Sequence, residues 1–486
     1  MAAASPNSAA TLEVIFSLED VLYRHLVPFL TAADLCRLES SSKQFSRTTT
    51  TDPSWKILCA RDFPQSNEPD SPLQCIAPVA SDLDVPSSFD LLKEMDNWKA
   101  AYQTWFYWKT FTCGMIPSAE MIQSIRMWAR LKRWLEENDL TGITESLLPG
   151  LSQEHYRTVQ RNTLSPKTLF PSSLLALAAV HAGQAGFEGN RIDHTFFRGI
   201  LGSWSVYNTI YCMRMDRILR TVELRSNFGS SPVIIGSSIT HPPIQMVIQK
   251  PVNQKDWHRY RIQLEIALSD PIIVAKDTTI LEYMEAYVDR LEAGVFKPAT
   301  IVPDLASIDT RGISLFPDAN MPMMSCAVTR GVQVKASARW TAGMVDETNG
   351  CNFAYSIRNQ LVDAPDALTK CQLVGRHWEF VDGHGAVRRV DGEAVVGKQP
   401  LLFRNEDSSF GYTDLGPAGN GETRTNEVFV YQSQSGPVRG TSQSDTGQAC
   451  VRGTFSFMPG SIDEPTGPLF HVTVAEFPLA IPMPFF

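Results

Sequence analysis

The alternation of apolar and polar residues divides the chain into three parts. Between residues 12 and 63, leucines recur three or four positions apart, which predicts short helices. Residues 115–300 combine helical periodicity with several short apolar runs, a mixture typical of an α+β domain. From residue 326 onward the period is two, and many short strands between polar turns predict a β-sandwich. The sequence therefore predicts a multidomain protein with an all-α, an α+β and an all-β part.

Composition shifts set the expected boundaries between these parts. The two predicted linkers are rich in Pro, Asp and small polar residues. Within the first linker, Trp98, Tyr102, Trp105 and Trp108 follow at helical intervals and predict an aromatic packing seam that seats the first module on the next. The expected segments are a disordered tail (1–11), a helical module (12–63), a linker with the aromatic helix (64–114), an α+β domain (115–300), a second linker (301–325) and a β domain (326–486).

A stripe of apolar residues crosses the helical module. Pro28 must kink or end the first helix, and Asp52-Pro53-Ser54 is typical of the start of the third. A module of this size cannot bury all these side chains alone, so we expect a partner to complete its core. A plain helical hairpin whose leucines face its own neighbours is the alternative. The stripe consists of Leu18, Val21, Leu22, Leu26, Phe29, Leu30, Leu35, Leu38 and Trp55.

The order of these residues, continued by Asp34, Phe45 and Phe63, resembles an F-box. This resemblance implies docking onto the Skp adaptor and, through Skp, onto a cullin in an SCF ubiquitin ligase. It assigns the nine residues of the stripe to the Skp-binding surface.

The α+β part contains two clear helix patterns. Ser118 is expected to cap a long helix that ends near Asn138, and Thr279-x-x-Glu282 is a capping box for a helix that ends near Gly294. With a Leu-Pro-Gly corner at 148–150 and a polar-Gly corner at 181–184, the order of motifs resembles the SUKH superfamily, also called the cell-wall assembly regulator-like domain. That resemblance implies a protein-binding module. The buried stripe expected on the first helix is Met121, Ile122, Ile125, Trp128, Leu131 and Leu135.

The stretch 371–402 carries the strongest signal in the β part. Strict alternation through Trp378, an Asp382-Gly turn and a second short run that ends at Val390 predict a β-hairpin. Two Ser/Gly/Asn-rich stretches, roughly 405–426 and 432–448, are expected to be exposed loops.

These residues, with Gln399-Pro400 and Gly453-x-Phe455, resemble the ApaG domain, which has an immunoglobulin- or fibronectin-like sandwich fold. The complete order of segments resembles the F-box proteins of animals and plants that end in an ApaG domain. It implies a non-catalytic substrate-recognition subunit. Such a subunit binds an unknown target protein through its middle and C-terminal domains.

A glycine loop directly after the hairpin raises an alternative function. ApaG relatives carry Gly-x-Gly-x-x-Gly here, a pattern likened to pyrophosphate-binding loops, whereas this chain has Ala394 at the middle glycine. The loop leads into an extended segment, so no helix N-terminus can meet a phosphate. A backbone nest for an anion and a simple turn both stay open, and the first would make the protein a nucleotide or polyphosphate binder. The candidate anion-loop residues are Gly392, Val395, Val396, Gly397 and Lys398.

The sequence lacks the common catalytic, nucleotide-binding and metal-binding motifs. It contains no Walker Gly-Lys-Ser/Thr, Gly-x-Ser-x-Gly, HExxH or CxxC pattern, so we expect no catalytic residues, metal site or cofactor. The nine scattered cysteines suggest buried reduced thiols. A net charge of −9 argues against nucleic-acid binding. Without a signal peptide or an apolar run of about 20 residues, we expect a soluble protein of the cytoplasm and/or nucleus that binds no membrane.

Overall fold

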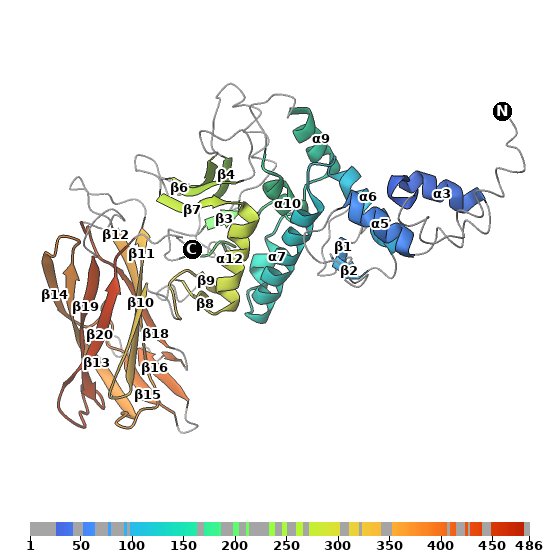
Figure 1. Ribbon diagram of the computed structural model, residues 1–486. Coiled ribbons are helices and arrows are strands. Elements are labelled where there is room, and N and C mark those ends of the chain that lie inside the picture. Colours follow the sequence, from blue (N-terminus) through green and yellow to red (C-terminus); the bar gives the residue numbers. More distant parts are fainter. Residues whose placement is uncertain are drawn as a thin grey trace, which may run out of the picture.

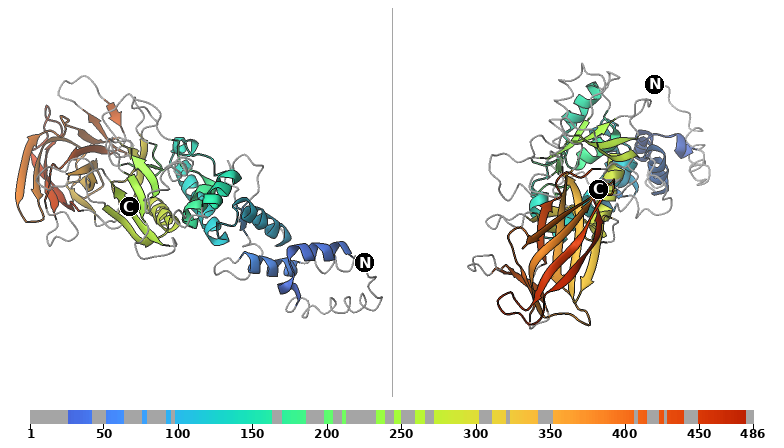
Figure 2. Two further views of the ribbon diagram at one scale, coloured as in Figure 1. Left: turned by 90° about the horizontal axis from the view of Figure 1, so that it is seen from above. Right: turned by 90° about the vertical axis from the view of Figure 1, so that its left-hand side faces the viewer.

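The computed structural model describes residues 26–41, 52–63, 76–78, 92–94, 98–162, 170–185, 198–203, 210–212, 233–238, 245–249, 259–265, 272–301, 311–319, 323–341, 352–405, 409–414, 423–425, 428–439 and 449–480. Its three parts lie in a row that follows the sequence, with the N-terminal helices at one end and the C-terminal sheets at the other (Figures 1 and 2). The division into helical, mixed and β parts agrees with the sequence pattern.

The described part of the helical module contains a short 3-10 turn, η2 (Val27–Phe29), and the helices α3 (Ala32–Ser41) and α5 (Asp52–Asp62). Pro28 lies in the first positions of η2, where its missing backbone donor costs no hydrogen bond, and the turn ends before Leu30. Thr31 caps α3, because its hydroxyl accepts from the Asp34 amide at 3.2 Å while the Asp34 carboxylate accepts from the Thr31 amide at 3.0 Å.

Helix α6 (Trp98–Phe111) connects this module to the middle domain. On the module side, the Tyr102 ring lies 5.4 Å from Trp55 and 5.1 Å from Phe63, measured between ring centroids. On the other side, Phe111 lies 5.9 Å from Tyr156. The predicted aromatic packing seam is therefore confirmed. A small hairpin of β1 (Ile76–Pro78) and β2 (Leu92–Glu94) lies in the predicted first linker.

The middle domain combines helices with a five-stranded antiparallel sheet. Helix α7 (Ser118–Glu137) packs against α10 (Ser172–Val180) and α12 (Ile280–Glu292), which also contact each other (Figure 1). All six residues of its predicted apolar stripe are buried. Pro117 rather than Ser118 occupies the cap position, whereas the end at Asn138 is as expected. Further elements are α8 (Thr141–Glu145), α9 (Gln153–Asn162), β3 (Ile210–Cys212), β4 (Val233–Ser238), β5 (Gln245–Gln249), β6 (Tyr260–Glu265) and β7 (Ile272–Thr278).

The segment expected to be the second linker contains ordered structure. Strand β9 (Arg311–Ser314) pairs with β8 (Lys297–Thr300), and Leu315 and Phe316, which directly follow β9, are buried. Next, the Asp318 carboxylate meets cations from both sides. Lys297 of the middle domain lies 2.6 Å away, whereas Lys335 and Arg358 of the β domain lie 3.4 Å away. This segment joins the two domains through packed and charged contacts.

The β domain consists of two sheets packed face to face. One sheet has the order β10 (Met324–Thr329), β11 (Val332–Thr341), β12 (Asn352–Leu361), β18 (Phe429–Gln434). The other has the order β17 (Thr423–Thr425), β16 (Phe410–Asp414), β15 (Leu401–Arg404), β13 (Lys370–Val381), β19 (Cys450–Pro459), β20 (Phe470–Pro478), and β14 (Val387–Glu393) pairs with β13. Tyr355 of the first sheet lies 6.0 Å from Trp378 of the second, which places the core between them.

The hairpin of β13 and β14 confirms the prediction for residues 371–390. The Asp382 carboxylate accepts hydrogen bonds from the amides of His384 and Ala386, and Gly385 has a φ of +83°. The prediction that 405–426 is only a loop was wrong, because β16 and β17 lie within it. There, Phe410 and Tyr412 alternate with Gly411 and Thr413, a strand pattern too short and too polar to stand out in the sequence.

Candidate functional site

An exposed aromatic side chain marks the surface of the helical module. Phe29, in η2, leaves 82% of its surface exposed, the largest value among the exposed large hydrophobic residues of the described chain. Its neighbours in sequence are anchored. Val27 is fully buried with Leu26, Leu38 and Ile57 packed around it. The turn is therefore held from inside while Phe29 faces solvent.

Arg61, near the end of α5, fixes this turn through its guanidinium group. Its Nη1 donates at 2.8 Å to the carbonyl oxygens of both Pro28 and Leu30, the residues that flank Phe29. The same group binds the Asp62 carboxylate at 2.6 and 2.8 Å, and the Tyr102 hydroxyl donates to Asp62 at 2.7 Å. The hydrogen bond from Arg61 is the largest influence on the Asp62 carboxyl and lowers its pKa. Together these contacts link η2, α5 and α6.

The nine residues predicted to bind Skp occupy different positions. Leu18, Val21 and Leu22 lie outside the described residues. Leu35 and Trp55 are buried within the chain, at 0% and 1% exposure, so in this conformation they support the module from inside. Leu26 and Leu38 pack on Val27, and Leu30 packs on the main core, each only partly buried. Phe29 alone among the described members of the set is open to solvent.

The glycine loop is a tight turn whose backbone donors are largely used within the chain. The amides of Val395 and Lys398 each donate to the other residue's carbonyl at 2.9 Å, which closes a two-residue turn of Val396 and Gly397. The amide of Ala394 donates to the Val374 carbonyl at 2.8 Å. These three amides cannot also receive an anion, so the geometry favours the turn over the nest.

Three residues of this loop have backbone angles that glycine adopts most easily. Ala394, Val396 and Gly397 have φ values of +60°, +50° and +74°, in the left-handed region that side chains with a Cβ disfavour. Ala394 occupies the middle position of the expected glycine pattern. Its positive φ would favour a glycine there for a conformational reason that involves no phosphate. Gly392, in β14, lies against the Arg376 guanidinium, Val395 is buried, and Val396 is 51% exposed.

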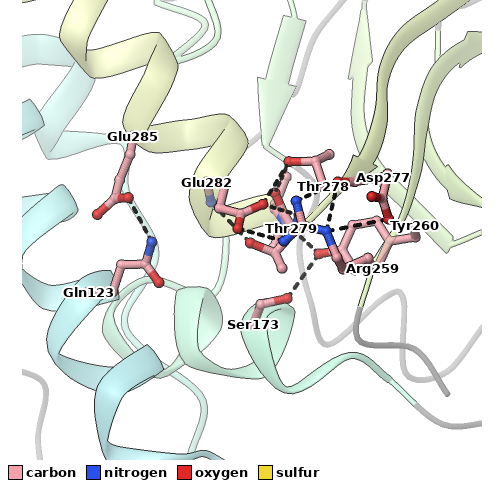
Figure 3. A network of polar contacts seen from close by, with 10 residues as sticks. Gln123, Ser173, Arg259, Tyr260, Asp277, Thr278, Thr279, Glu282 and Glu285 are labelled. Carbon is pink, nitrogen blue, oxygen red and sulfur yellow. Dashed lines mark hydrogen bonds and ion pairs between the residues drawn. The ribbon is translucent and has the colours of Figure 1, made fainter. Parts of the chain in front are cut away.

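Figure 3 shows a network of polar contacts in the middle domain. The Tyr260 hydroxyl lies 2.9 Å from the Ser173 hydroxyl and accepts from the amide of Ile280, the first residue of α12. The predicted capping box of Thr279 and Glu282 is present, and Arg259 donates to Glu282 at 2.8 Å. Because Ser173 and Tyr260 are buried and paired with each other, this network holds α12 onto the sheet.

The described residues offer few groups suited to metal binding or thiol chemistry. No group of three or more His, Cys, Asp or Glu side chains there could hold a metal ion. Six cysteines in this part of the chain form no disulfide; Cys36 and Cys326 among them are exposed, unlike the buried thiols expected. None of the described helices combines the length and apolarity needed to cross a bilayer.

Sequence reasoning missed Arg61 as a site residue. Its importance comes from two carbonyl oxygens that lie 33 and 31 positions earlier in the chain. No local sequence pattern predicts such a contact. The only available signal was its place next to Asp62 at the end of the predicted third helix, which by itself indicates a surface ion pair.

Comparisons with known proteins find relatives of the C-terminal domain and a relative of nearly the whole chain. A family model described as the ApaG domain matches residues 344–418. "Protein ApaG" of Anaeromyxobacter dehalogenans is 32% identical over 161 residues, which cover 33% of this chain and 97% of that protein. "F-box protein SKIP16" of Arabidopsis thaliana is 25% identical over 472 residues, 92% of this chain and 94% of that protein. A crystal structure of an ApaA protein from Bordetella pertussis is 28% identical and covers 32% of this chain and 94% of that chain, with a TM-score of 0.22.

Proposed function

Because the chain belongs to the ApaG family through its C-terminal domain, and is similar along most of its length to an F-box protein, we propose that it is a substrate-recognition subunit of an SCF ubiquitin ligase. The helical module, as an F-box, binds the Skp adaptor, and Skp connects it to a cullin. The middle domain, which we propose to be SUKH-like, and the ApaG domain bind the protein to be ubiquitinated. The cytoplasm and/or nucleus is the proposed location.

The observation that carries this proposal is the similarity to an F-box protein over 92% of the chain. The open side chain of Phe29 beside anchored residues supports it, because an adaptor that covers this surface would bury an aromatic group. In the proposed ligase, the ubiquitin-charged enzyme and the target lysine are brought together by the assembly. Proximity then supplies the rate enhancement, and this chain contributes no catalytic group.

Co-purification of the full chain with the Skp adaptor and cullin tests the proposal. Phe29→Ser removes the exposed aromatic group and is expected to weaken Skp binding by about 30-fold, as loss of a central interface aromatic does. Phe106→Ser is the matched control. Phe106 lies on α6, is 55% exposed, and is not among the residues of the stripe, so its variant is expected to bind Skp like the wild type.

Three results would contradict parts of this proposal. Absence of Skp from the wild-type preparation contradicts the F-box assignment, and equal binding by both serine variants contradicts the assignment of Phe29. Recovery of Skp without cullin or ubiquitin transfer would instead identify a scaffold that acts outside a ligase.

We do not propose nucleotide binding through the glycine loop. The amides of Ala394, Val395 and Lys398 are used within the chain, and the loop meets no helix N-terminus. Titration with nucleoside and dinucleoside polyphosphates, followed by calorimetry, would reveal such an activity if another part of the domain carried it.

A further inference from the structure

One sheet of the β domain is buried on both of its faces. In β11, Ala336 and Ala338 belong to the core between the two sheets, so Ser337 and Arg339 lie on the outer face. An antiparallel sheet commonly leaves its outer face to water. Here Ser337 and Arg339 are only 0% and 3% exposed, and Ser356 of β12, paired with Ser337, is 2% exposed. Another part of the chain therefore covers this face.

The outer face binds residues 315–318, the joint segment, which directly follows β9. Arg339 donates from Nε to the Leu315 carbonyl at 2.6 Å. Arg358, in β12, donates from Nη2 to the Pro317 carbonyl at 2.9 Å and to the Ser337 hydroxyl at 2.8 Å. Both guanidinium groups therefore bind the backbone of the joint segment, and a charged donor makes such hydrogen bonds stronger than neutral ones.

The same segment is built into the middle domain. The Leu315 amide donates to the Ser203 carbonyl at 2.8 Å, and the Asp318 amide donates to the Val295 carbonyl at 3.0 Å. A Cβ at Gly202 would lie 2.7 Å from the Leu315 side chain, so the backbone approaches this leucine closely. Figure 1 shows the hairpin of β8 and β9, which leads into the joint segment, between α12 and the β domain. The joint segment thus belongs to both domains.

The charged groups of the joint are largely enclosed. Asp318 and Arg358 leave 15% and 12% of their side chains exposed, and their nearest charged atoms lie 3.4 Å apart. The Arg339 guanidinium lies 5.3 Å from the centre of the buried Phe296 ring, which belongs to the middle domain. Removing one partner of an enclosed ion pair leaves the other charge uncompensated, so such a pair resists separation of the surfaces that carry it.

Domains of one chain usually move relative to each other unless their interface prevents it. From these contacts we propose that the joint segment locks the middle domain and the β domain into one rigid body, with Asp318, Arg339 and Arg358 as the residues that hold it. A molecule bound by either domain then keeps a fixed orientation to the other domain. This rigid joint does not depend on the proposed ligase function.

Residual dipolar couplings of backbone amides in the full chain test the proposal, because they report how each domain is aligned. In the wild type, couplings from α7 and α12 and couplings from β13 and β19 are expected to fit one alignment tensor, so that the two domains give magnitudes in a ratio near one. In Arg358→Gln, the ratio of the smaller to the larger magnitude is expected to fall below about 0.6, as for parts that move independently.

Matched arginine variants locate the residues that hold the joint. Arg339→Met keeps an apolar stem but loses the bond to the Leu315 carbonyl, so a smaller fall in the ratio is expected. Arg389→Gln is the control. Arg389 belongs to the other sheet, is 69% exposed and binds Glu379 at 3.0 Å, so its loss should leave the ratio near one. Amide chemical shifts of β13 check that the sandwich of each variant is folded.

Several outcomes overturn the proposal. Two different alignment tensors in the wild type would show that the domains already move independently. An unchanged ratio in Arg358→Gln, or equal effects of Arg358→Gln and Arg389→Gln, would show that these arginines do not hold the joint. If Arg358→Gln does not fold, the wild-type couplings and the comparison of Arg339→Met with Arg389→Gln decide alone.

Discussion

The two ends of this protein complete their cores in different ways. The ApaG sandwich buries its large aromatic residues between two sheets of its own, with Trp378, Phe455 and Phe477 all at 1% exposure or less. The helical module has a separate cluster of one buried residue, Val27, and leans on α6 for the burial of Trp55. It also leaves Phe29 open.

This difference shows where to look for partners. A domain that buries its own aromatic residues is stable without help, so substitutions there act mainly on folding. The Skp surface that we propose lies on a small module with an exposed aromatic side chain, so we expect substitutions there to act mainly on binding. The following predictions test this contrast, from the largest expected effect to the smallest.

Gly453→Ala is expected to damage the sandwich most. A Cβ at Gly453, in β19, would lie 2.1 Å from the carbonyl oxygen of His377 in the paired strand β13, and backbone atoms there must shift. We expect the free energy of unfolding to fall by about 3 kcal/mol or more, at the upper end of overpacking effects. Chemical denaturation followed by circular dichroism measures this loss.

Gly467→Ala is the matched control in the same domain. Its added Cβ would lie 3.5 Å from Pro459, an ordinary contact, so little change is expected. Skp binding by the Gly453 variant should persist below its unfolding transition. If it is lost while the helices remain folded, the two ends are not independent and the contrast fails.

Acid is expected to destabilise the part between the two ends. His181, on the middle domain beside Trp128, is largely enclosed, and burial lowers its pKa to about 4 from the ordinary 6.5. Lys132 also lowers this pKa, whereas a hydrogen bond to the Leu148 carbonyl raises it. Because the folded pKa is depressed, the stability due to neutral His181 is present above pH 6.5 and lost as the pH falls through 4.

The expected loss is up to roughly 3 kcal/mol at the acid end of this window. Unfolding free energies of the wild type and His181→Gln, measured from pH 7 to 4, check it, because the variant cannot take up the proton. An equally steep pH dependence in both proteins would show that other groups are responsible.

Arg61→Gln is expected to affect binding more than folding. The variant loses the hydrogen bonds that hold the carbonyls of Pro28 and Leu30, so the turn that presents Phe29 is no longer fixed. We expect Skp binding to weaken about tenfold with a small change in unfolding temperature. Combining it with Phe29→Ser should give less than the sum of the two effects, because both act on one contact. Additive losses would place Arg61 elsewhere in the interface.

Local patterns allowed much of the fold to be predicted. The capping box at Thr279 and Glu282 and the Asp382 turn depend on residues within four positions of each other, so the sequence displays them directly. The packing of the α7 stripe follows from helical periodicity alone.

The site was less accessible to sequence reasoning, because its contacts are distant or depend on backbone angles. The bonds from Arg61 cross more than thirty residues. Strand β9 was hidden in a polar stretch whose burial depends on pairing with β8. The pattern around Gly392 could not separate a nest from a turn, since the two differ in φ and in which amides are already used.

Ala394→Gly is the smallest change and separates the two interpretations of the glycine loop. Ala394 has a φ of +60°, and replacement by glycine removes the cost of that conformation. Against the entropy that glycine adds to the unfolded chain, we expect a net gain of about 0.5–1 kcal/mol in unfolding free energy. Ala386→Gly, in the exposed turn of the same hairpin and without a positive φ, should instead lose stability. Denaturant titrations compare the two. Because Ala394→Gly also completes a Gly-x-Gly-x-x-Gly pattern at residues 392–397, a polyphosphate titration of the same variant is decisive. A gain in stability without binding would mean that glycine at this position serves only the turn. New affinity for polyphosphate would contradict that interpretation and support an anion site.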